Sequence, residues 1–200
     1  LTEAKDLFVA DNCNTGNPHF GSKLAFGPDG VLYMTIGERG DRNRAQNTAI
    51  HGGKVLRLTA DGAAAPGNPF LAKEGYKPEI FTYGNRNAQG LAIHPESGDV
   101  WANEHGPQGG DELNLIRPMV NYGWPVIGFG VNYTTGLAIH AGTHREGMQQ
   151  PAQVWVPSIG ISGLMIYTGD KFPQWKGNFF VGGMVGEQLV RLTLEPKRGF

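Results

Sequence analysis

A short sequence pattern occurs twice in this chain, about 67 residues apart. Residues 24–33 are LAFGPDGVLY, and residues 91–101 are LAIHPESGDVW, with one extra residue before the second glycine. A second pair, VLRLT at 55–59 and LVRLT at 189–193, lies at about twice that spacing. Recurrence at a fixed period of tens of residues indicates repeated units, none of which can bury its apolar face alone. The chain is therefore expected to fold as a row of similar modules.

The apolar runs between the turns are short, and Gly, Pro, Asn or Asp bounds each of them. The 31 glycines and 13 prolines make up about 22% of the chain, against a typical ~12%. This pattern predicts an all-β protein with many tight turns. We see no amphipathic helix of four turns, and we expect residues 128–150 to form a long loop. The predicted strands are 24–26, 31–36, 54–58, 79–83, 91–93, 100–102, 154–156, 164–167, 178–181 and 188–194.

Small four-stranded sheets repeated around an axis form a β-propeller, which limits exposed sheet edges. The alternative is that LAxxPxxG is merely a common hairpin sequence. Two sequence patterns are each repeated, and one repeat spacing is about twice the other. This agreement favours the propeller. At about 67 residues per unit, 200 residues provide only three units, whereas closed propellers have roughly four to eight blades. The chain is thus expected either to be part of a larger propeller or to assemble with other chains.

Composition excludes several classes of function. A net charge of −1 and a pI of about 6.7 do not point to nucleic acid, whose partners are usually basic. No apolar run approaches the ~20 residues needed to span a bilayer, and residues 1–10 do not resemble a signal peptide. Cys13 has no second cysteine with which to form an internal disulfide. No GxGxxG fingerprint follows a strand, which argues against Rossmann-type binding of nicotinamide or flavin.

The segment 83–90, YGNRNAQG, concentrates polar groups between two predicted strands. An arginine on a glycine-flanked loop, here Arg86, suits bidentate recognition of a carboxylate. The alternative is a turn in which asparagines such as Asn87 satisfy the local backbone and Arg86 is solvated. Composition alone favours that alternative.

The segment 103–112, NEHGPQGGDE, could supply oxygen ligands. Calcium takes six to eight oxygens, including backbone carbonyls and carboxylates. Gly106 and Pro107 offer carbonyls, and Asp111 and Glu112 offer carboxylates, although the spacing is not that of an EF-hand. A polar turn with solvated acids is an equally good interpretation.

Histidine is the usual general base near neutral pH. The chain has six histidines, and spacing alone selects none of them, because a lone histidine more often makes a structural hydrogen bond. His19 lies just before the first repeat strand. No pair of histidines has a zinc-site spacing such as HExxH.

Six segments together resemble a known family, in the order in which that family carries them. The chain is similar to the soluble quinoprotein glucose dehydrogenases, and more similar to the periplasmic aldose sugar dehydrogenases of the glucose/sorbosone dehydrogenase family. The similarity covers nearly the whole chain. The segments are HFGSKLAFGPDG at 19–30, GKVLRL at 53–58, YGNRNAQG at 83–90, EHGP at 104–107, GDELN at 110–114 and NYGWP at 121–125.

The resemblance implies a six-bladed β-propeller. Residues 1–200 would form a partial propeller domain of about three to four middle blades, with the first and last blades missing. It also implies oxidation of the C1 hydroxyl of an aldose to a lactone, with pyrroloquinoline quinone and calcium as cofactors. The electron acceptor is not identified by the sequence, and the implied location is periplasmic or secreted.

The resemblance assigns roles to individual residues. His19 would be the general base that takes the proton from the C1 hydroxyl. Arg86 would lie beside the quinone and stabilise negative charge, as preorganised donors do. Asn87, His105 and the Gly106–Pro107 turn would also contact the cofactor.

Calcium ligands follow from the same resemblance. The carbonyls of Gly106 and Pro107 would hold the calcium ion that binds the quinone, where it would act as a Lewis acid. Glu112 and the Tyr122 carbonyl resemble ligands of a separate structural calcium. Asp111 is a further candidate ligand there.

Some positions depart from the family pattern. Pro18 stands where the glucose dehydrogenases carry an aspartate, which argues against strict recognition of glucose. Val185 stands about where a cofactor-binding lysine is expected, and two cofactor-binding arginines would lie beyond Phe200. The chain alone is therefore not expected to hold the quinone tightly.

Two other functions remain open at this point. One is a non-catalytic calcium-binding propeller that binds a protein or sugar partner, and the other is a calcium-dependent lactonase. The dehydrogenase interpretation requires that His19, Arg86 and the Gly106–Pro107 turn converge on one pocket.

Overall fold

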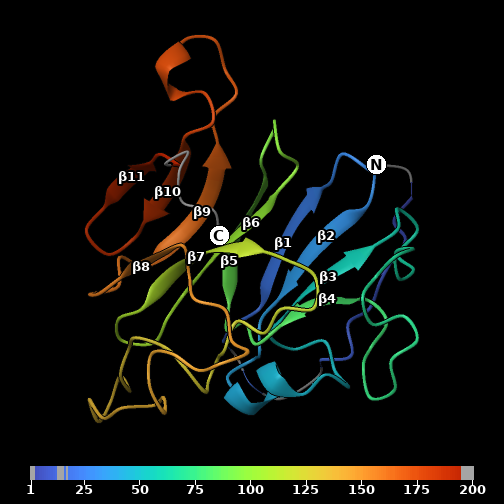
Figure 1. The fold of residues 1–200 in the computed structure, drawn as a ribbon, viewed down its shortest axis with the longest axis horizontal. Helices are drawn as coiled ribbons and strands as arrows, with labels where there is room; N and C mark the ends of the chain where they lie inside the picture. Colours follow the sequence, from blue (N-terminus) through green and yellow to red (C-terminus); the bar gives the residue numbers. More distant parts are fainter. Residues whose placement is uncertain (1–2, 13–15, 17, 195–200) are drawn as a thin grey trace.

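The structure is a computed structural model that describes residues 3–12, 16 and 18–194, so Cys13 lies outside the described residues. Its described part contains three antiparallel sheets and two short 3-10 helices (Figure 1). The helices are η1 (Arg42–Gln46) and η2 (Pro173–Trp175). The strands are β1 (Gly21–Phe26), β2 (Leu32–Ile36), β3 (Lys54–Leu58), β4 (Ile80–Tyr83), β5 (Ala88–Ile93), β6 (Val100–Glu104), β7 (Asp111–Ile116), β8 (Gln153–Trp155), β9 (Ile161–Ile166), β10 (Phe179–Gly183) and β11 (Gln188–Leu192).

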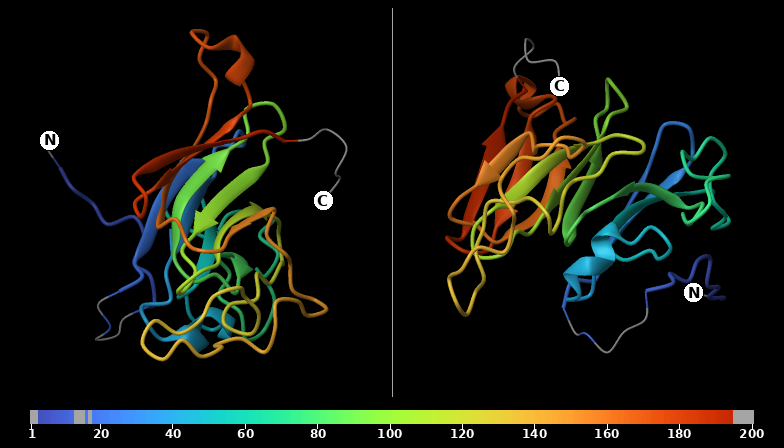
Figure 2. Two further views of the ribbon diagram at one scale, coloured as in Figure 1. Left: turned by 90° about the vertical axis from the view of Figure 1, so that its left-hand side faces the viewer. Right: turned by 60° about the horizontal axis from the view of Figure 1, so that its bottom comes forward.

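The three sheets are the blades of a partial β-propeller. Each is a meander of consecutive strands, in the orders β1-β2-β3-β4, β5-β6-β7-β8 and β9-β10-β11. The first strands are neighbours, since β5 contacts both β1 and β9. The sheets therefore fan out side by side from these inner strands (Figure 2, right). This arrangement confirms the prediction of an all-β propeller.

The sequence repeat marks equivalent strands of successive blades. The LAxxPxxG pattern covers β1 and β5, which are the first strands of their sheets, and its Pro-containing turn leads into β2 or β6. The second echo covers β3 and β11, which are both third strands. The second pattern therefore recurs at about twice the spacing of the first, because its two copies lie two blades apart and those of the first pattern lie one blade apart.

Strand β7 was missed by the sequence analysis, which left residues 103–112 open between a segment of calcium ligands and a polar turn with solvated acids. Asp111 opens this strand, yet its side chain is buried because it accepts hydrogen bonds from Gly106 N, Ser158 Oγ and Ile161 N. Polar residues on a buried strand obscure the apolar alternation on which strand prediction depends. The long loop at 128–150 is confirmed, since it contains only turns and isolated bridges.

Apolar side chains fill the spaces between adjacent blades. Tyr33, Val55 and Leu91 belong to a cluster between the first two sheets, and Trp101 packs edge-on against Phe179 between the second and third, with ring centroids 4.9 Å apart. Full burial of such a side chain contributes about 1.5–3 kcal/mol. Blade stacking thus fixes how the loops at the strand ends meet.

The connections that carry η1 and the 128–150 loop lie at one end of the blades. Both Figure 1 and Figure 2 (left) place η1 and the 128–150 loop at the same end, while η2 projects at the other. The inner strands β1 and β5 also begin at that end, which brings the residues just before them together. Among the described residues, no helix is long and apolar enough to cross a membrane.

Candidate active site

A cleft of about 370 Å³ opens at the end of the blades where β1 and β5 begin. His19, Arg86 and Pro107 line it together, although they are far apart in the sequence. A smaller cavity of about 20 Å³ adjoins it, and Arg86, Pro107 and Trp124 line both spaces. The structure therefore meets the geometric condition that the dehydrogenase interpretation set.

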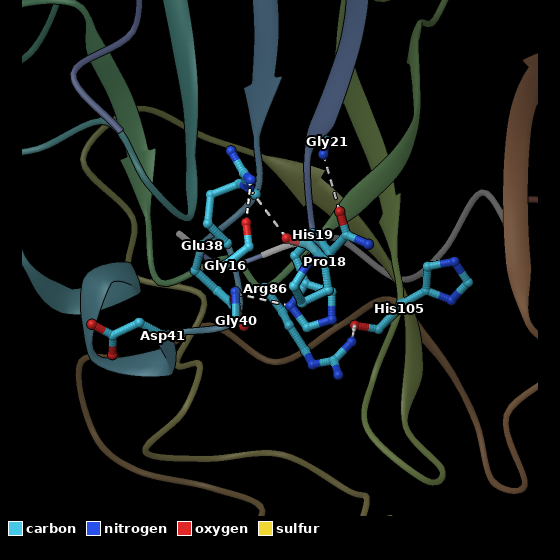
Figure 3. A network of polar contacts seen from close by, with 12 residues as sticks. Gly16, Pro18, His19, Gly21, Glu38, Gly40, Asp41, Arg86 and His105 are labelled. Carbon is cyan, nitrogen blue, oxygen red and sulfur yellow. Dashed lines mark hydrogen bonds and ion pairs between the residues drawn. The ribbon is translucent and has the colours of Figure 1, made fainter. Parts of the chain in front are cut away.

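His19 is held by a buried carboxylate. Its Nδ1 lies 2.8 Å from Oε2 of Glu38, whose side chain is only 1% exposed (Figure 3). The same oxygen accepts a hydrogen bond from Gly40 N. With Nδ1–H donating to Glu38, the other ring nitrogen, Nε2, carries a free lone pair and can accept a proton. This arrangement suits a general base.

The backbone at His19 adopts a conformation that side-chain-bearing residues rarely take. Its φ is 60°, and its carbonyl oxygen would lie 2.0 Å from a Cβ atom at Gly37. Position 37 must therefore be glycine for the chain just after β2 to pass this close to His19. Strain of this kind concentrates at functional sites, where the surrounding structure stabilises it.

Glu38 was not among the residues that the sequence analysis selected. It follows β2 directly, and its partner lies 19 residues earlier, so no local spacing links the two. For the sugar oxidation that the sequence resemblance implies, we expect Glu38→Gln to lower kcat by about 10- to 100-fold, because a neutral amide no longer stabilises the protonated imidazole.

The measurement is steady-state dye reduction by the full-length protein, with the quinone and calcium that the resemblance implies both at saturation. Glu74→Gln, an exchange at an exposed position, is the control and should be unchanged. Wild-type kcat in Glu38→Gln would show that Glu38 does not assist the base.

Arg86 combines burial with unused donors. It is 7% exposed, its Nη1 donates to the His105 carbonyl at 3.3 Å, and its guanidinium carbon lies 5.1 Å from the ring centroid of Trp124. Among the described residues, Arg86 Nε and Trp124 Nε1 have no acceptor although both atoms are buried. Buried donors without partners are costly, so this wall of the cleft suits a ligand rich in acceptor oxygens.

A buried glutamate that the sequence analysis missed holds the Arg86 loop. Glu104 accepts hydrogen bonds from the backbone N–H groups of Arg86 and Asn87 at Oε2. Its Oε1 accepts from Asn85 Nδ2 at 2.9 Å and Asn114 Nδ2 at 3.3 Å. Burial raises the pKa of Glu104, whereas these four donors favour its ionised form.

All four partners of Glu104 are donors, two at each carboxylate oxygen. In a glutamine the NH2 group, which is itself a donor, would have to point at two of them. We expect Glu104→Gln to lower the free energy of unfolding by about 3 kcal/mol. Urea denaturation measures this change, with Glu187→Gln in an exposed turn as the control. A loss below about 0.5 kcal/mol would mean that the loop does not depend on this carboxylate.

Asn87 and His105 are placed differently from Arg86. Asn87 Oδ1 accepts from Gly21 N at 3.1 Å and Gln89 Nε2 at 2.9 Å, so its carbonyl ties β1 to the next blade, and it lines neither space. His105 lines the smaller cavity, but its ring points away from Arg86 in Figure 3. Burial lowers the pKa of His105.

The Gly106–Pro107 turn presents both carbonyl oxygens to hydroxyl groups. Gly106 O accepts from Tyr133 Oη at 3.2 Å, and Pro107 O accepts from Ser158 Oγ at 3.3 Å. Asp111 fixes the turn by accepting from Gly106 N. Hydroxyl donors on long hydrogen bonds can be displaced, so the carbonyls remain available to a cation.

Glu112 and Tyr122 line the small cavity together with Glu104. Burial and the neighbouring Glu104 carboxylate raise the pKa of Glu112 to about 8, and Asn114 Nδ2 bridges the two acids. A cation would offset the charge of this pair. Within the described ranges, no group of three His, Cys, Asp or Glu side chains is arranged to hold a metal, so a cation here would rely on backbone oxygens as well.

Comparison with known proteins gives one consistent result. The family model of glucose/sorbosone dehydrogenases matches residues 1–199. The chain is 40% identical over 182 residues to the aldose sugar dehydrogenase YliI of Escherichia coli, covering 90% of this chain and 49% of that protein.

Solved structures agree. A glucose dehydrogenase crystal structure matches with a TM-score of 0.86 at 46% identity, over 89% of this chain and 52% of the other. The PQQ-bound aldose sugar dehydrogenase of Streptomyces coelicolor matches with a TM-score of 0.72 at 37% identity, over 90% and 47%. The chain thus spans about half the length of the relatives it matches.

Proposed function

Because this chain belongs to the glucose/sorbosone dehydrogenase family, we propose that the protein containing it oxidises the C1 hydroxyl of aldose sugars to lactones, using pyrroloquinoline quinone and calcium. The observation that carries the proposal is the convergence of His19, Arg86 and Pro107 on one cleft. The PQQ-bound structural relative supports the choice of cofactor.

The residues present fit an acceptor-rich quinone. Arg86 Nε and Trp124 Nε1 are buried donors that lack acceptors in the described part of the chain. Carboxylate and carbonyl oxygens of a bound quinone would satisfy them. Arg86, His105 and the Gly106–Pro107 turn would hold the cofactor, whereas Asn87, which lines neither space, would support them by tying β1 to the next blade. When bound, the calcium-polarised quinone would supply the hydride acceptor.

The chain's own residues supply the proton chemistry. His19 Nε2 takes the proton from the C1 hydroxyl as the hydride leaves the same carbon. Glu38, at 2.8 Å from Nδ1, stabilises the imidazolium that forms. The fixed guanidinium of Arg86 stabilises negative charge that develops in the cleft, and it needs no reorganisation to do so.

Two calcium sites complete the proposal. The carbonyls of Gly106 and Pro107 would bind the ion at the quinone. Glu112 and the Tyr122 carbonyl would bind a second, structural ion. The raised pKa of Glu112 supports this, because a bound cation would balance the negative charge of the two buried acids. Asp111, whose oxygens accept from three donors, orients the turn.

We further propose that residues 1–200 are part of a larger propeller with additional blades. Leu91 in β5 is 8% exposed, whereas Leu24, its repeat equivalent in β1, is 58% exposed, and Phe26 is 63% exposed. A further blade packed on β1 would cover them. Other parts of the propeller would complete the quinone contacts that Val185 does not provide. The electron acceptor is unidentified, and the proposed location is periplasmic or secreted.

The test is aldose-dependent dye reduction by the full-length protein, with quinone and calcium each added or omitted. Activity that requires both additions supports the dehydrogenase. Calcium binding without activity on a broad sugar panel would instead favour a non-catalytic binding propeller. Hydrolysis of lactones without quinone would favour a calcium-dependent lactonase. Because Pro18 replaces the aspartate of the glucose dehydrogenases, the panel should extend beyond glucose.

A further inference from the structure

Lys54, the first residue of β3, is completely buried. Its ammonium donates to three backbone carbonyls, those of Arg44 at 2.9 Å, Ala45 at 3.0 Å and Gly52 at 2.5 Å. No carboxylate of the described residues pairs with it. Burial lowers its pKa to about 7. Burying an ammonium is costly, and a core position could have been filled by leucine or methionine.

Two of the three carbonyls belong to η1. This helix is a single turn, and its ends are closed by Arg44 N donating to Asp41 O and Asn47 N donating to Arg44 O. Such short 3-10 turns are not stable alone. A lysine near the end of a helix can donate to its last carbonyls, and Lys54 adds a second donor to Arg44 O and to Ala45 O, which also accepts from Gly84 N. The position of η1 therefore depends on the residues outside the helix that form hydrogen bonds to it.

The other end of η1 faces the cleft. Asp41, Arg42 and Asn43 line the same space as His19, and Asp41 Oδ1 caps the turn at Asn43 N. Lys54 lines neither the cleft nor the small cavity. It can affect a bound ligand only by holding η1.

Lys54 is itself on a rigid support. In the first sheet it pairs with Ile36 of β2 and Tyr83 of β4. The chain after Ile36 leads directly to Glu38, the partner of His19. Lys54 therefore binds η1 directly, and through its pairing with Ile36 it is tied to the segment that carries Glu38, the partner of His19.

We propose that Lys54 is a positioning residue that clamps η1 against the first blade and so sets the sugar-facing wall of the cleft relative to His19. This inference rests on the proposed function for its substrate, but the clamp itself is a property of the fold. A second tie, from Gln46 Nε2 to Trp124 O at 2.7 Å and Asn121 Oδ1 at 3.0 Å, keeps η1 attached when Lys54 is removed. Loss of Lys54 should therefore displace the wall without detaching it.

The test uses Lys54→Met in the full-length protein with quinone and calcium. Methionine keeps most of the apolar length but donates no hydrogen bond. We expect KM for the aldose to rise about 10-fold while kcat stays within about threefold, because sugar binding is weakened and the base and Arg86 are untouched. Lys176→Met is the matched control, since that lysine is 52% exposed in the third blade, and it should leave both constants unchanged.

Hydrogen exchange provides a readout independent of activity. In Lys54→Met, peptides covering 41–47 should exchange at least about 10-fold faster, whereas peptides from β5, β6 and β7 should keep their wild-type rates. If the methionine variant does not fold, Lys54→Gln is used, whose amide can reach fewer of the carbonyls.

The outcomes separate clearly. Uniformly faster exchange, or a lower kcat with unchanged KM, would overturn the clamp and leave Lys54 as a general stability residue. If the wild-type protein oxidises no aldose, the proposed function fails, while exchange confined to 41–47 still supports the clamp.

Discussion

Replacing His19 with glutamine should lower kcat for aldose oxidation by about 10²- to 10⁴-fold, the usual contribution of a positioned general base. His19 is the histidine that lines the cleft, and Glu38 fixes its ring so that Nε2 is the proton acceptor. Glutamine retains a polar side chain of similar reach but cannot take the proton. The dissociation constant for the quinone should change by less than about threefold, since the variant keeps Arg86 and the Gly106–Pro107 turn.

The measurement is steady-state dye reduction across a pH series, with quinone binding followed separately by titration. His144→Gln, at an exposed position in the long loop, is the control. If His19→Gln keeps more than about a tenth of the wild-type kcat, the base lies elsewhere and the mechanism is wrong at its central step.

The second large effect concerns calcium and the Glu104–Glu112 pair. Without calcium, burial and the Glu104 carboxylate raise the pKa of Glu112 from 4.5 to about 8. The folded protein then binds this proton more tightly than the unfolded chain does. Its contribution to stability is fully present below about pH 4.5 and is lost as pH rises through about 8. The expected loss is on the order of a few kcal/mol.

Thermal unfolding in a chelator should therefore show Tm falling between pH 5 and pH 8. Adding calcium at pH 8 should restore Tm, because an ion that binds only the folded state at 100 times its Kd contributes about 2.7 kcal/mol. Glu112→Gln is neutral at every pH, so its Tm should depend less on pH and should respond little to calcium. Glu146→Gln, at an exposed position, should behave as wild type. A calcium response retained in Glu112→Gln would place the ion away from this acid.

Many of the strands followed from local sequence pattern. The runs at 24–26, 54–58 and 91–93 lie within β1, β3 and β5, because short apolar runs between turn residues depend only on near neighbours. The failure at β7 has the opposite cause. Two of the three donors to the buried Asp111 side chain, Ser158 and Ile161, belong to a distant segment, and nothing within a few residues of Asp111 indicates them.

Some residues of the candidate site could likewise be identified from the sequence, and others could not. Resemblance of ordered motifs pointed to His19, Arg86 and the Gly106–Pro107 turn, each of which lies within a distinctive short segment. It did not identify Glu38, Glu104 or Lys54. Each of these acts through partners that the packing of strands and loops within one blade brings near, and a lone Glu or Lys in the sequence is usually an ordinary solvated charge.

The sequence by itself determined the repeated blade, the turns that close its hairpins and the segments that carry polar chemistry, because these depend on contacts between close neighbours along the chain. The tertiary structure alone decided which of those segments meet, and which buried charges hold them. Stacking β1 against β5 brings His19 and Arg86 to one cleft, while packing within the blades supplies the partners of the buried Glu38, Glu104 and Lys54. A buried charge persists only where partners satisfy it, and those partners are in place only after the chain has folded.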